Sequence, residues 1–170
     1  MWQQDTGEEL HRKTRNMKYW LVKTESSTYS IDDLKKDKKT HWHGVRNYQA
    51  RNFLKDMELG DLVLFYQSVN EPLGVSGVAK VVKIAYPDPS QFEKNSEYYE
   101  EKSSPKEPRW FCPDLKFSRK FKEIIKLADL KKEKDLMDMH LLKIGSRLSV
   151  QPVTEKEFDK IVKLAGNERD

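Results

Sequence analysis

The amino-acid sequence predicts one mixed domain, of the α+β class or a β-barrel with helices around it. Its 170 residues lie within the usual size range of a single domain. Seven Phe, seven Tyr and four Trp provide material for a core, whereas disordered chains are poor in aromatic residues. Short apolar segments typical of strands occur along the chain with helix-like segments between and after them, which favours such a mixed fold.

The first predicted elements are a strand and a short helix. Tyr-Trp-Leu-Val at 19–22 is an apolar run with aromatic and branched side chains, which predicts a buried strand. Ser30 is a typical helix cap, and Asp33 follows it three residues later. The helix that starts there would turn Ile31 and Leu34 inward. The domain thus begins with a strand that needs burial and a helix with an apolar face.

A second helix and two long strands follow. Asn47 is predicted to cap the helix and Gly60 to close it. One face of this helix is apolar at spacings of three and four residues, at Ala50, Phe53, Leu54 and Met57. Leu62–Tyr66 and Val75–Tyr86 have strand character, and a turn at 70–74 separates them.

The second half of the chain begins with a loop and then returns to regular structure. Residues 87–108 contain four prolines in a mixture of Ser, Glu and Lys, and Pro-Asp-Pro at 87–89 is a good turn. After this loop, Trp110–Phe121 is expected to be a strand, Asp129–Met139 a helix and Lys143–Gln151 a last strand.

The final helix has the most complete start signal in the chain. Thr154 and Glu157 have the spacing of a capping box, in which side chains and backbone N–H groups bond reciprocally. Gly166 is expected to end the helix. The apolar stripe between them consists of Phe158, Ile161, Val162 and Ala165.

Residues 1–16 differ in character from the remainder of the chain. They have no sustained apolar period, and three acids balance three bases. They also lack the 7–15-residue apolar core of a secretory signal. We interpret them as a flexible leader and place the folded domain at 17–166.

Removal of residues 1–16 is expected to leave the stability of the domain nearly unchanged, because the segment has no apolar face with which to dock. The measurement is a thermal melt of the truncated chain beside the full chain. A fall in melting temperature of about 4 °C or more, on the order of a kcal/mol, would contradict this expectation.

Composition excludes some classes of protein. No apolar run approaches the ~18–20 residues that cross a bilayer, so no membrane span is predicted. The single cysteine, Cys112, cannot form an internal disulfide, which indicates a reducing compartment: the cytoplasm or, in a eukaryote, the nucleus. The net charge of +4, from 32 Lys and Arg against 28 Asp and Glu, is compatible with an anionic partner.

Patterns for catalysis or metal binding are weak. His41 and His43 would share one face of a strand, but no nearby cysteine or HExxH helix completes a metal site. Cys112 lies in an apolar stretch and is interpreted as an inert hydrophobic residue. The sequence contains neither GxSxG, a Walker loop nor GxGxxG. We therefore predict a protein without catalytic residues, metal or cofactor.

Residues 41–52 are better suited to binding. They combine an indole, a glycine, two arginines and three amides in twelve positions. Trp42 can stack on a base, Asn47 can read a base edge, and the arginines can hold phosphates. The alternative is that Asn47 only caps its helix and Trp42 only fills the core. Their occurrence in a single turn favours a recognition loop.

Other segments could converge on this loop. The ends of two predicted strands, at 23–25 and 65–68, carry polar side chains next to aromatic ones, and Pro108-Arg109-Trp110 places a cation beside an indole. Aromatic residues at strand ends also occur simply as core. A basic run at 116–134, with eight Lys or Arg against three acids, is either a solvated face or a contact for a phosphate backbone.

Several motifs together resemble those of one family. They are Met17–Glu25 (MKYWLVKTE), Trp42–Asn52 (WHGVRNYQARN), Gly60–Ser68 (GDLVLFYQS), Ala85–Pro89 (AYPDP), Pro108–Trp110 (PRW) and Arg147–Val153 (RLSVQPV). In this content and order the chain is similar to the EVE domain family, from about Met17 to Ala165. Two positions depart from the family's usual pattern: Ser26 replaces a proline, and Gln67 replaces a common histidine.

The resemblance implies a PUA-like fold, a strongly bent β-barrel surrounded by helices and related to ASCH and YTH domains. It also implies a pocket for a modified nucleobase, with 5-methylcytosine-type bases in DNA as the best supported class. The residues that the family motifs assign to this pocket are Lys23, Glu25, Trp42, Val45, Arg46, Asn47, Tyr66, Ser68, Arg109 and Trp110.

Three functional hypotheses follow, and the first is a non-catalytic module that encloses a modified DNA base flipped out of the stack. The second is a PUA-like or YTH-like reader of modified or structured RNA, which a contact to the 2′-hydroxyl would distinguish. The third is an enzyme that acts on a small molecule or nucleotide in the same pocket, although no nucleophile–base pair is visible. A monomer or weak dimer is expected.

Overall fold

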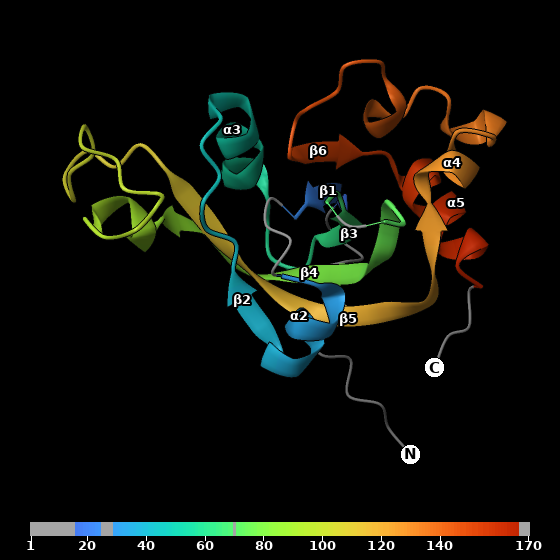
Figure 1. Ribbon diagram of the computed structural model, residues 1–170, viewed down its shortest axis with the longest axis horizontal. Helices are drawn as coiled ribbons and strands as arrows, with labels where there is room; N and C mark the ends of the chain where they lie inside the picture. Colours follow the sequence, from blue (N-terminus) through green and yellow to red (C-terminus); the bar gives the residue numbers. More distant parts are fainter. Residues whose placement is uncertain (1–15, 25–28, 70, 167–170) are drawn as a thin grey trace.

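The computed structural model describes residues 16–24, 29–69 and 71–166, which form a strongly bent mixed sheet of six strands with helices around it (Figure 1). The strands are β1 (Tyr19–Lys23), β2 (Lys39–His41), β3 (Leu62–Gln67), β4 (Gly74–Pro87), β5 (Phe111–Lys126) and β6 (Val150–Val153). The helices are α2 (Ile31–Asp37), α3 (Tyr48–Asp56), α4 (Leu127–Leu130) and α5 (Glu155–Leu164), with 3₁₀ helices at Pro89–Phe92, Lys134–Leu136 and His140–Leu142. The α+β class predicted from the sequence is confirmed.

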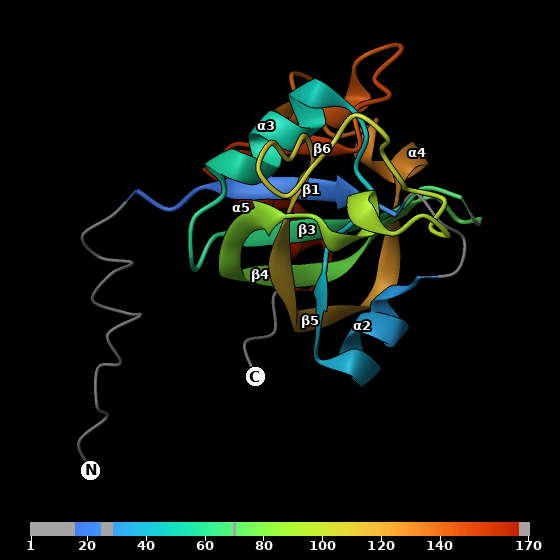
Figure 2. The same ribbon diagram turned by 90° about the vertical axis from the view of Figure 1, so that its left-hand side faces the viewer.

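The sheet has the strand order β2-β5-β4-β3-β1-β6. Strands β1 and β3 are parallel, and all other neighbouring pairs are antiparallel. The pairing of the two longest strands, β4 and β5, has four register shifts, which are typical of bulges that bend and twist a strand. Figure 2 shows β5 curving around the layer of β1, β3 and β4. Within the described residues β2 and β6 are free edges, so the bent sheet does not close into a barrel.

Both faces of the central strands are buried, which explains why they are almost continuous apolar runs in the sequence. In β1, Trp20 and Val22 contribute to the core under α2 and α3, whereas Leu21 contributes to the core under α4 and α5. In β3, Phe65 contributes to the core under α2 and α3, and Leu64 contributes to the core under α4 and α5. Alternate residues of a strand face opposite sides, so one short run supplies both cores.

The predicted starts of three helices are confirmed. Ser30 with Asp33 and Thr154 with Glu157 form complete capping boxes at the starts of α2 and α5. The Asn47 side chain accepts a hydrogen bond of 2.9 Å from the third backbone N–H of its helix, α3. A Ser, Thr or Asn cap of this kind is worth about 0.5–2 kcal/mol over alanine.

The predicted helix at Asp129–Met139 is wrong. The chain forms only the short α4 there, followed by the 3₁₀ helices at Lys134–Leu136 and His140–Leu142. No side chain caps the first turn of α4. The buried residues Leu130, Leu136 and Met139 are separated by six and three positions, which suits successive short turns better than one α-helix face.

A last strand is present, but its predicted bounds, Lys143–Gln151, are wrong, because strand structure begins only at Val150 and continues to Val153. Gly145 has a φ of +76°, which interrupts any extended strand before that point. β6 pairs with β1 as an edge strand, where Pro152 is tolerated. The three-residue strand β2 was not predicted, since Lys39–His41 is too short and too polar to give a strand signal.

Two predictions concern residues that the structure does not describe. The leader predicted at 1–16 lies outside the described residues apart from Asn16, and so does the predicted site residue Glu25. Within the described ranges, no helix is both long and apolar enough to cross a membrane.

Candidate functional site

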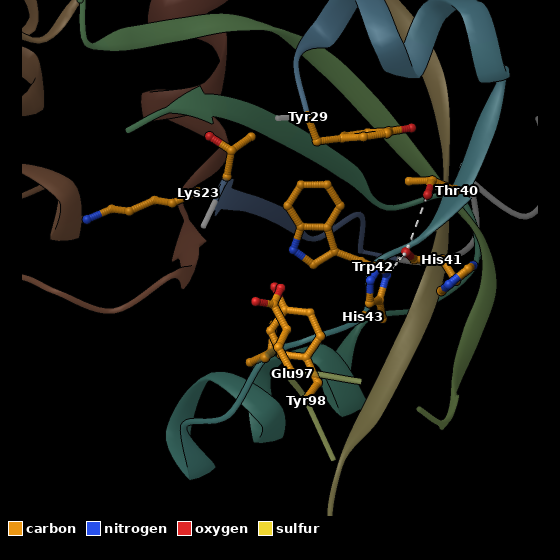
Figure 3. Close-up of a pocket in the computed structure, with 10 residues that line it drawn as sticks. Lys23, Tyr29, Thr40, His41, Trp42, His43, Glu97 and Tyr98 are labelled. Carbon is orange, nitrogen blue, oxygen red and sulfur yellow. Dashed lines mark hydrogen bonds between the residues drawn. The ribbon is translucent and has the colours of Figure 1, made fainter. Parts of the chain in front are cut away.

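A pocket with a volume of about 220 Å³ opens where the end of β1, the edge strand β2 and two loops meet (Figure 3). Aromatic rings supply most of its walls, and polar groups lie between them. The lining residues are Lys23, Thr24, Tyr29, Thr40, His41, Trp42, His43, Val45, Glu97 and Tyr98. They come from segments that are far apart in the sequence, so the pocket depends on the complete fold.

Trp42 forms the floor of the pocket. Its side chain is 9% exposed and belongs to the core under α2 and α3. The indole packs edge-on against Phe65, with 5.5 Å between ring centroids, and against Tyr29 at 6.5 Å. Among the described residues no group accepts a hydrogen bond from the indole N–H, which faces the pocket in Figure 3. Trp42 therefore contributes to the core and presents a polar edge to the pocket.

Tyr98 forms the opposite wall and depends on Gly44 and Arg46. Gly44 has a φ of +89°, and a β-carbon at this position would lie 2.8 Å from the Tyr98 ring. The Arg46 guanidinium donates hydrogen bonds of 3.2 and 2.8 Å to the Tyr98 carbonyl. It also lies 5.5 Å from the Tyr98 ring centroid, within the range of a cation–π contact. Gly44 and Arg46 thus determine the position of this wall.

Asp88 is the buried anchor of the same network. Its side chain is fully buried and accepts hydrogen bonds from the Gly44 N–H at 2.8 Å and from Arg46 Nη1 at 3.0 Å. The other carboxylate oxygen accepts from the backbone N–H and hydroxyl of Ser90. Burial raises the pKa of Asp88, but the hydrogen bonds from Ser90, Gly44 and Arg46 outweigh it and hold the pKa below its ordinary value.

The upper side of the pocket is formed by Tyr29, which precedes α2. Its hydroxyl donates a 3.0 Å hydrogen bond to Asp37. Burial is the main reason that the pKa of Tyr29 is raised to about 12, so the phenol is neutral at physiological pH. Lys23 lies at the other end, and burial lowers the pKa of its ammonium. In Figure 3 the Lys23 side chain points away from Trp42, and Nζ is 3.4 Å from the Ser146 carbonyl.

The structure brings together only part of the set assigned to the pocket by resemblance. Lys23, Trp42 and Val45 line the pocket. Arg46 lies behind the wall in the Asp88 network, and the exposed Asn47 uses its side-chain oxygen to cap α3. Of these five residues, only three line the cavity.

The remaining predicted residues lie around the pocket. Tyr66 is 3% exposed, and the Lys23 Nζ lies 5.8 Å from its ring centroid. The Ser68 hydroxyl donates to the Thr24 carbonyl and so fastens the end of β3 beside β1. Arg109 lies on the neighbouring surface beside α3, where the buried Trp110 stacks with Tyr48.

That neighbouring surface combines cations with aromatic rings, and we call it the arginine–aromatic face: Tyr48, Arg51, Lys55, Arg109, Trp110 and Phe111. Tyr48 is 51% exposed and stacks on the buried Trp110, with 4.9 Å between ring centroids. Arg51 lies 4.7 Å from the Tyr48 ring and donates a 2.9 Å hydrogen bond to the Arg109 carbonyl. Arg46 lies 5.4 Å from the Trp110 ring and thereby connects this face to the pocket wall.

Sequence reasoning missed several lining residues. Glu97 and Tyr98 lie in the segment interpreted only as a loop, although two adjacent tyrosines at 98–99 are an unusual signal in a polar loop. His41 and His43 are exposed, with 4.7 Å between ring centroids. Within the described parts of the chain, no group of three or more His, Cys, Asp or Glu side chains is placed to hold a metal ion.

The fold and the site define a small α+β domain with a partly buried aromatic pocket and a cationic surface beside it. The EVE domain family model matches residues 18–164. This match covers most of the chain, and the protein belongs to the EVE domain family. The membership inferred from the sequence motifs is confirmed.

The chain is also similar to individual proteins and solved structures. Thymocyte nuclear protein 1 of Homo sapiens is 41% identical over 169 residues, which cover 88% of this chain and 75% of the relative. A crystal structure of the human THYN1 protein in complex with 5-methylcytosine-containing DNA has a TM-score of 0.83 and 40% identity, covering 89% of this chain and 99% of that one. The YTH domain of the Zygosaccharomyces rouxii MRB1 protein, solved with N6-methyladenosine RNA, has a TM-score of 0.52 and 14% identity, covering 91% and 88% of the two chains, and shows likeness of fold alone.

Proposed function

We propose that this protein is a non-catalytic nucleic-acid-binding module that encloses a base of the 5-methylcytosine type, flipped out of DNA, in the pocket over Trp42. The observation that carries the proposal is the pocket itself, walled by Tyr29, Trp42 and Tyr98 and open to solvent on one side. A relative with 40% identity is known in complex with 5-methylcytosine-containing DNA. The bent sheet then corresponds to a PUA-like fold that spans 17–166.

The energetics of base binding are consistent with such a pocket. Extrusion of a base from a duplex costs a few kcal/mol. Contact with aromatic rings recovers about 1–3 kcal/mol per base. A methyl group buried against those rings adds only about 0.8 kcal/mol. Enclosure of a base in this pocket is therefore feasible, and the methyl group alone gives a modest preference.

The arginine–aromatic face supplies the contacts to the strand around the flipped base. Arg51 and Arg109 place positive charge beside the exposed ring of Tyr48, and Lys55 places it over the Phe111 ring. Such alternation of cations and aromatic rings suits a nucleic-acid strand, because the cations meet phosphates and the rings meet bases. Binding through this face depends strongly on salt concentration.

Filling the pocket tests the proposal directly. Thr40 lines the pocket from β2, so Thr40→Trp places an indole in the space that a base would occupy. We expect the affinity of the variant for a 5-methylcytosine oligonucleotide to be lower by about tenfold or more, since the variant loses the stacking of one base. The measurement is a fluorescence-anisotropy titration at fixed salt, after a thermal melt has shown that the variant is folded.

Lys39→Trp is the matched control for this variant. Lys39 precedes Thr40 on β2, is exposed and is not one of the residues that line the pocket. The control adds an indole of the same size and also removes a positive charge, which by itself would weaken binding to DNA. A larger loss of affinity in Thr40→Trp therefore cannot be attributed to a change of charge. Equal binding by folded Thr40→Trp and Lys39→Trp would reject the pocket as the binding site.

The alternative functions give different results in the same titration. A reader of modified RNA would prefer RNA oligonucleotides over DNA of the same sequence, through contacts to the 2′-hydroxyl. An enzyme acting on nucleotides would release product steadily, with loss of turnover on mutation of His41 or His43. We propose the DNA-binding function over both, in a monomer or weak dimer that works in the cytoplasm or, in a eukaryote, the nucleus.

A further inference from the structure

We infer that Glu97 reads the 4-amino group of the enclosed cytosine and thereby excludes thymine from the pocket. The inference rests on the function proposed above and assigns the residue that sets its base specificity. Glu97 lies on the loop opposite Trp42 and was not among the residues assigned by family resemblance.

A reader of 5-methylcytosine needs such a residue because thymine is present throughout DNA. Thymine carries the same 5-methyl group, so contacts to the methyl group cannot separate the two bases. The difference lies at position 4, where cytosine has an amino donor and thymine a carbonyl acceptor. A pocket that selects 5-methylcytosine over thymine must therefore present a hydrogen-bond acceptor to position 4.

Glu97 is such an acceptor. It lines the same pocket as Trp42, and Figure 3 shows its carboxylate pointing into the space beside the indole. An ionised carboxylate only accepts hydrogen bonds, so it suits an amino group and opposes a carbonyl oxygen. No described residue donates to the Glu97 side chain or accepts from the Trp42 N–H, so both groups are available to a ligand.

Several other polar groups of the pocket are already engaged within the fold. The Tyr29 hydroxyl donates to Asp37, and the hydroxyls of Thr24 and Thr40 lie within hydrogen-bond distance of backbone carbonyls. The carboxylate of Glu97 and the N–H of Trp42 thus offer one acceptor and one donor within the same pocket. The edge of cytosine has the complementary order, because its 4-amino donor adjoins the ring nitrogen N3, an acceptor.

The test measures base preference with the full chain. Short DNA duplexes carry one 5-methylcytosine, cytosine or thymine opposite an abasic site, so that no base pair must be broken. The wild-type protein is expected to bind the 5-methylcytosine duplex about tenfold more tightly than the thymine duplex. This ratio is the discrimination that a well-placed hydrogen bond between a side chain and a base typically gives. Its preference over cytosine is expected to be about fourfold, from the methyl group.

Glu97→Gln is expected to bring the ratio between 5-methylcytosine and thymine close to one, because the amide can present either its oxygen or its NH₂ group. The ratio between 5-methylcytosine and cytosine should remain about fourfold. Glu97→Ala should also lose the selection against thymine. The matched control is Glu101→Gln, an exposed position on the same loop that does not line the pocket and loses the same charge.

The results separate this inference from the proposed function. If Glu97→Gln and Glu101→Gln keep the same preference over thymine, or if the wild-type protein has none, Glu97 does not read position 4. In that case Thr40→Trp still weakens binding and the proposed function stands. If Thr40→Trp and the wild-type protein bind alike, the pocket itself is rejected and the inference with it.

Discussion

Replacement of Asp88 by alanine is expected to lower the free energy of unfolding by about 3–5 kcal/mol, the usual cost of removing one partner of a buried ion pair. Asp88 is fully buried and paired with Arg46 at 3.0 Å. The substitution also leaves the Gly44 N–H and the Ser90 N–H without their acceptors. For a domain of this size the melting temperature should fall by about 6–20 °C.

Asp32→Ala is the matched control for this prediction. Asp32 forms an ion pair of 2.7 Å with Lys120, but both side chains are largely exposed. Exposed pairs of this kind contribute only about 0.2–1 kcal/mol. Both variants are compared by thermal and urea unfolding. Losses of similar size in Asp32→Ala and Asp88→Ala would show that the buried network has no special role in stability.

The stability contributed by Asp88 also depends on pH. The folded protein holds the pKa of this carboxyl below its ordinary value, so folding favours the ionised form. The contribution is complete above the ordinary Asp pKa of about 4 and is lost as the pH falls through the lower pKa of the folded state. Asp88→Asn should therefore be less stable than the wild-type protein at neutral pH, and the difference should shrink in strong acid.

The Asp88 network illustrates what the sequence does not reveal. Pro-Asp-Pro at 87–89 has the pattern of a turn, and Asp88 does cap the 3₁₀ helix at Pro89–Phe92. Arg46 was assigned to the pocket by resemblance to a family motif. The two side chains are 42 residues apart and bond to each other, which no local pattern indicates. Each residue stands out in the sequence only within its own segment, and the fold brings the two together.

Local patterns predicted most of the fold correctly. Helix caps at Ser30, Asn47 and Thr154 depend on side chains three residues from their backbone partners, so the sequence contains the whole interaction. The segment at Asp129–Met139 failed because its structure depends on burial against the sheet. There Leu130 and Leu136 reach the core through separate short turns.

The candidate site was predictable only where it depends on one local segment of the sequence. The segment at 41–52 has enough indole, glycine and arginine to be recognised as a binding loop, and Trp42 and Val45 do line the pocket. The wall formed by Glu97 and Tyr98 was not foreseen. Its position depends on the hydrogen bonds from Arg46 to a carbonyl 52 residues away. The sequence therefore predicted the floor of the pocket and missed the wall opposite it.

Trp42→Ala is expected to destabilise the fold by about 3–5 kcal/mol, which is the usual cost of truncating a buried aromatic side chain. Stacking on a base, considered alone, would predict a loss of about 1–3 kcal/mol of affinity and little change in stability. The low exposure of Trp42 and its packing against Phe65 and Tyr29 place the larger effect in folding. The measurement is urea unfolding of the variant beside the wild-type protein.

Trp42→Phe separates the two roles of this side chain, because phenylalanine retains a ring against Phe65 and lacks the indole N–H. We expect this variant to stay folded at 25 °C and to bind the 5-methylcytosine duplex more weakly than the wild-type protein does. Lys120→Ala, on the exposed basic face, should weaken binding to modified and plain duplexes alike if it contacts a phosphate. A Trp42→Ala protein as stable as the wild type would contradict the role of Trp42 in the core. Undiminished binding by folded Trp42→Phe would show that the indole N–H does not contact the base.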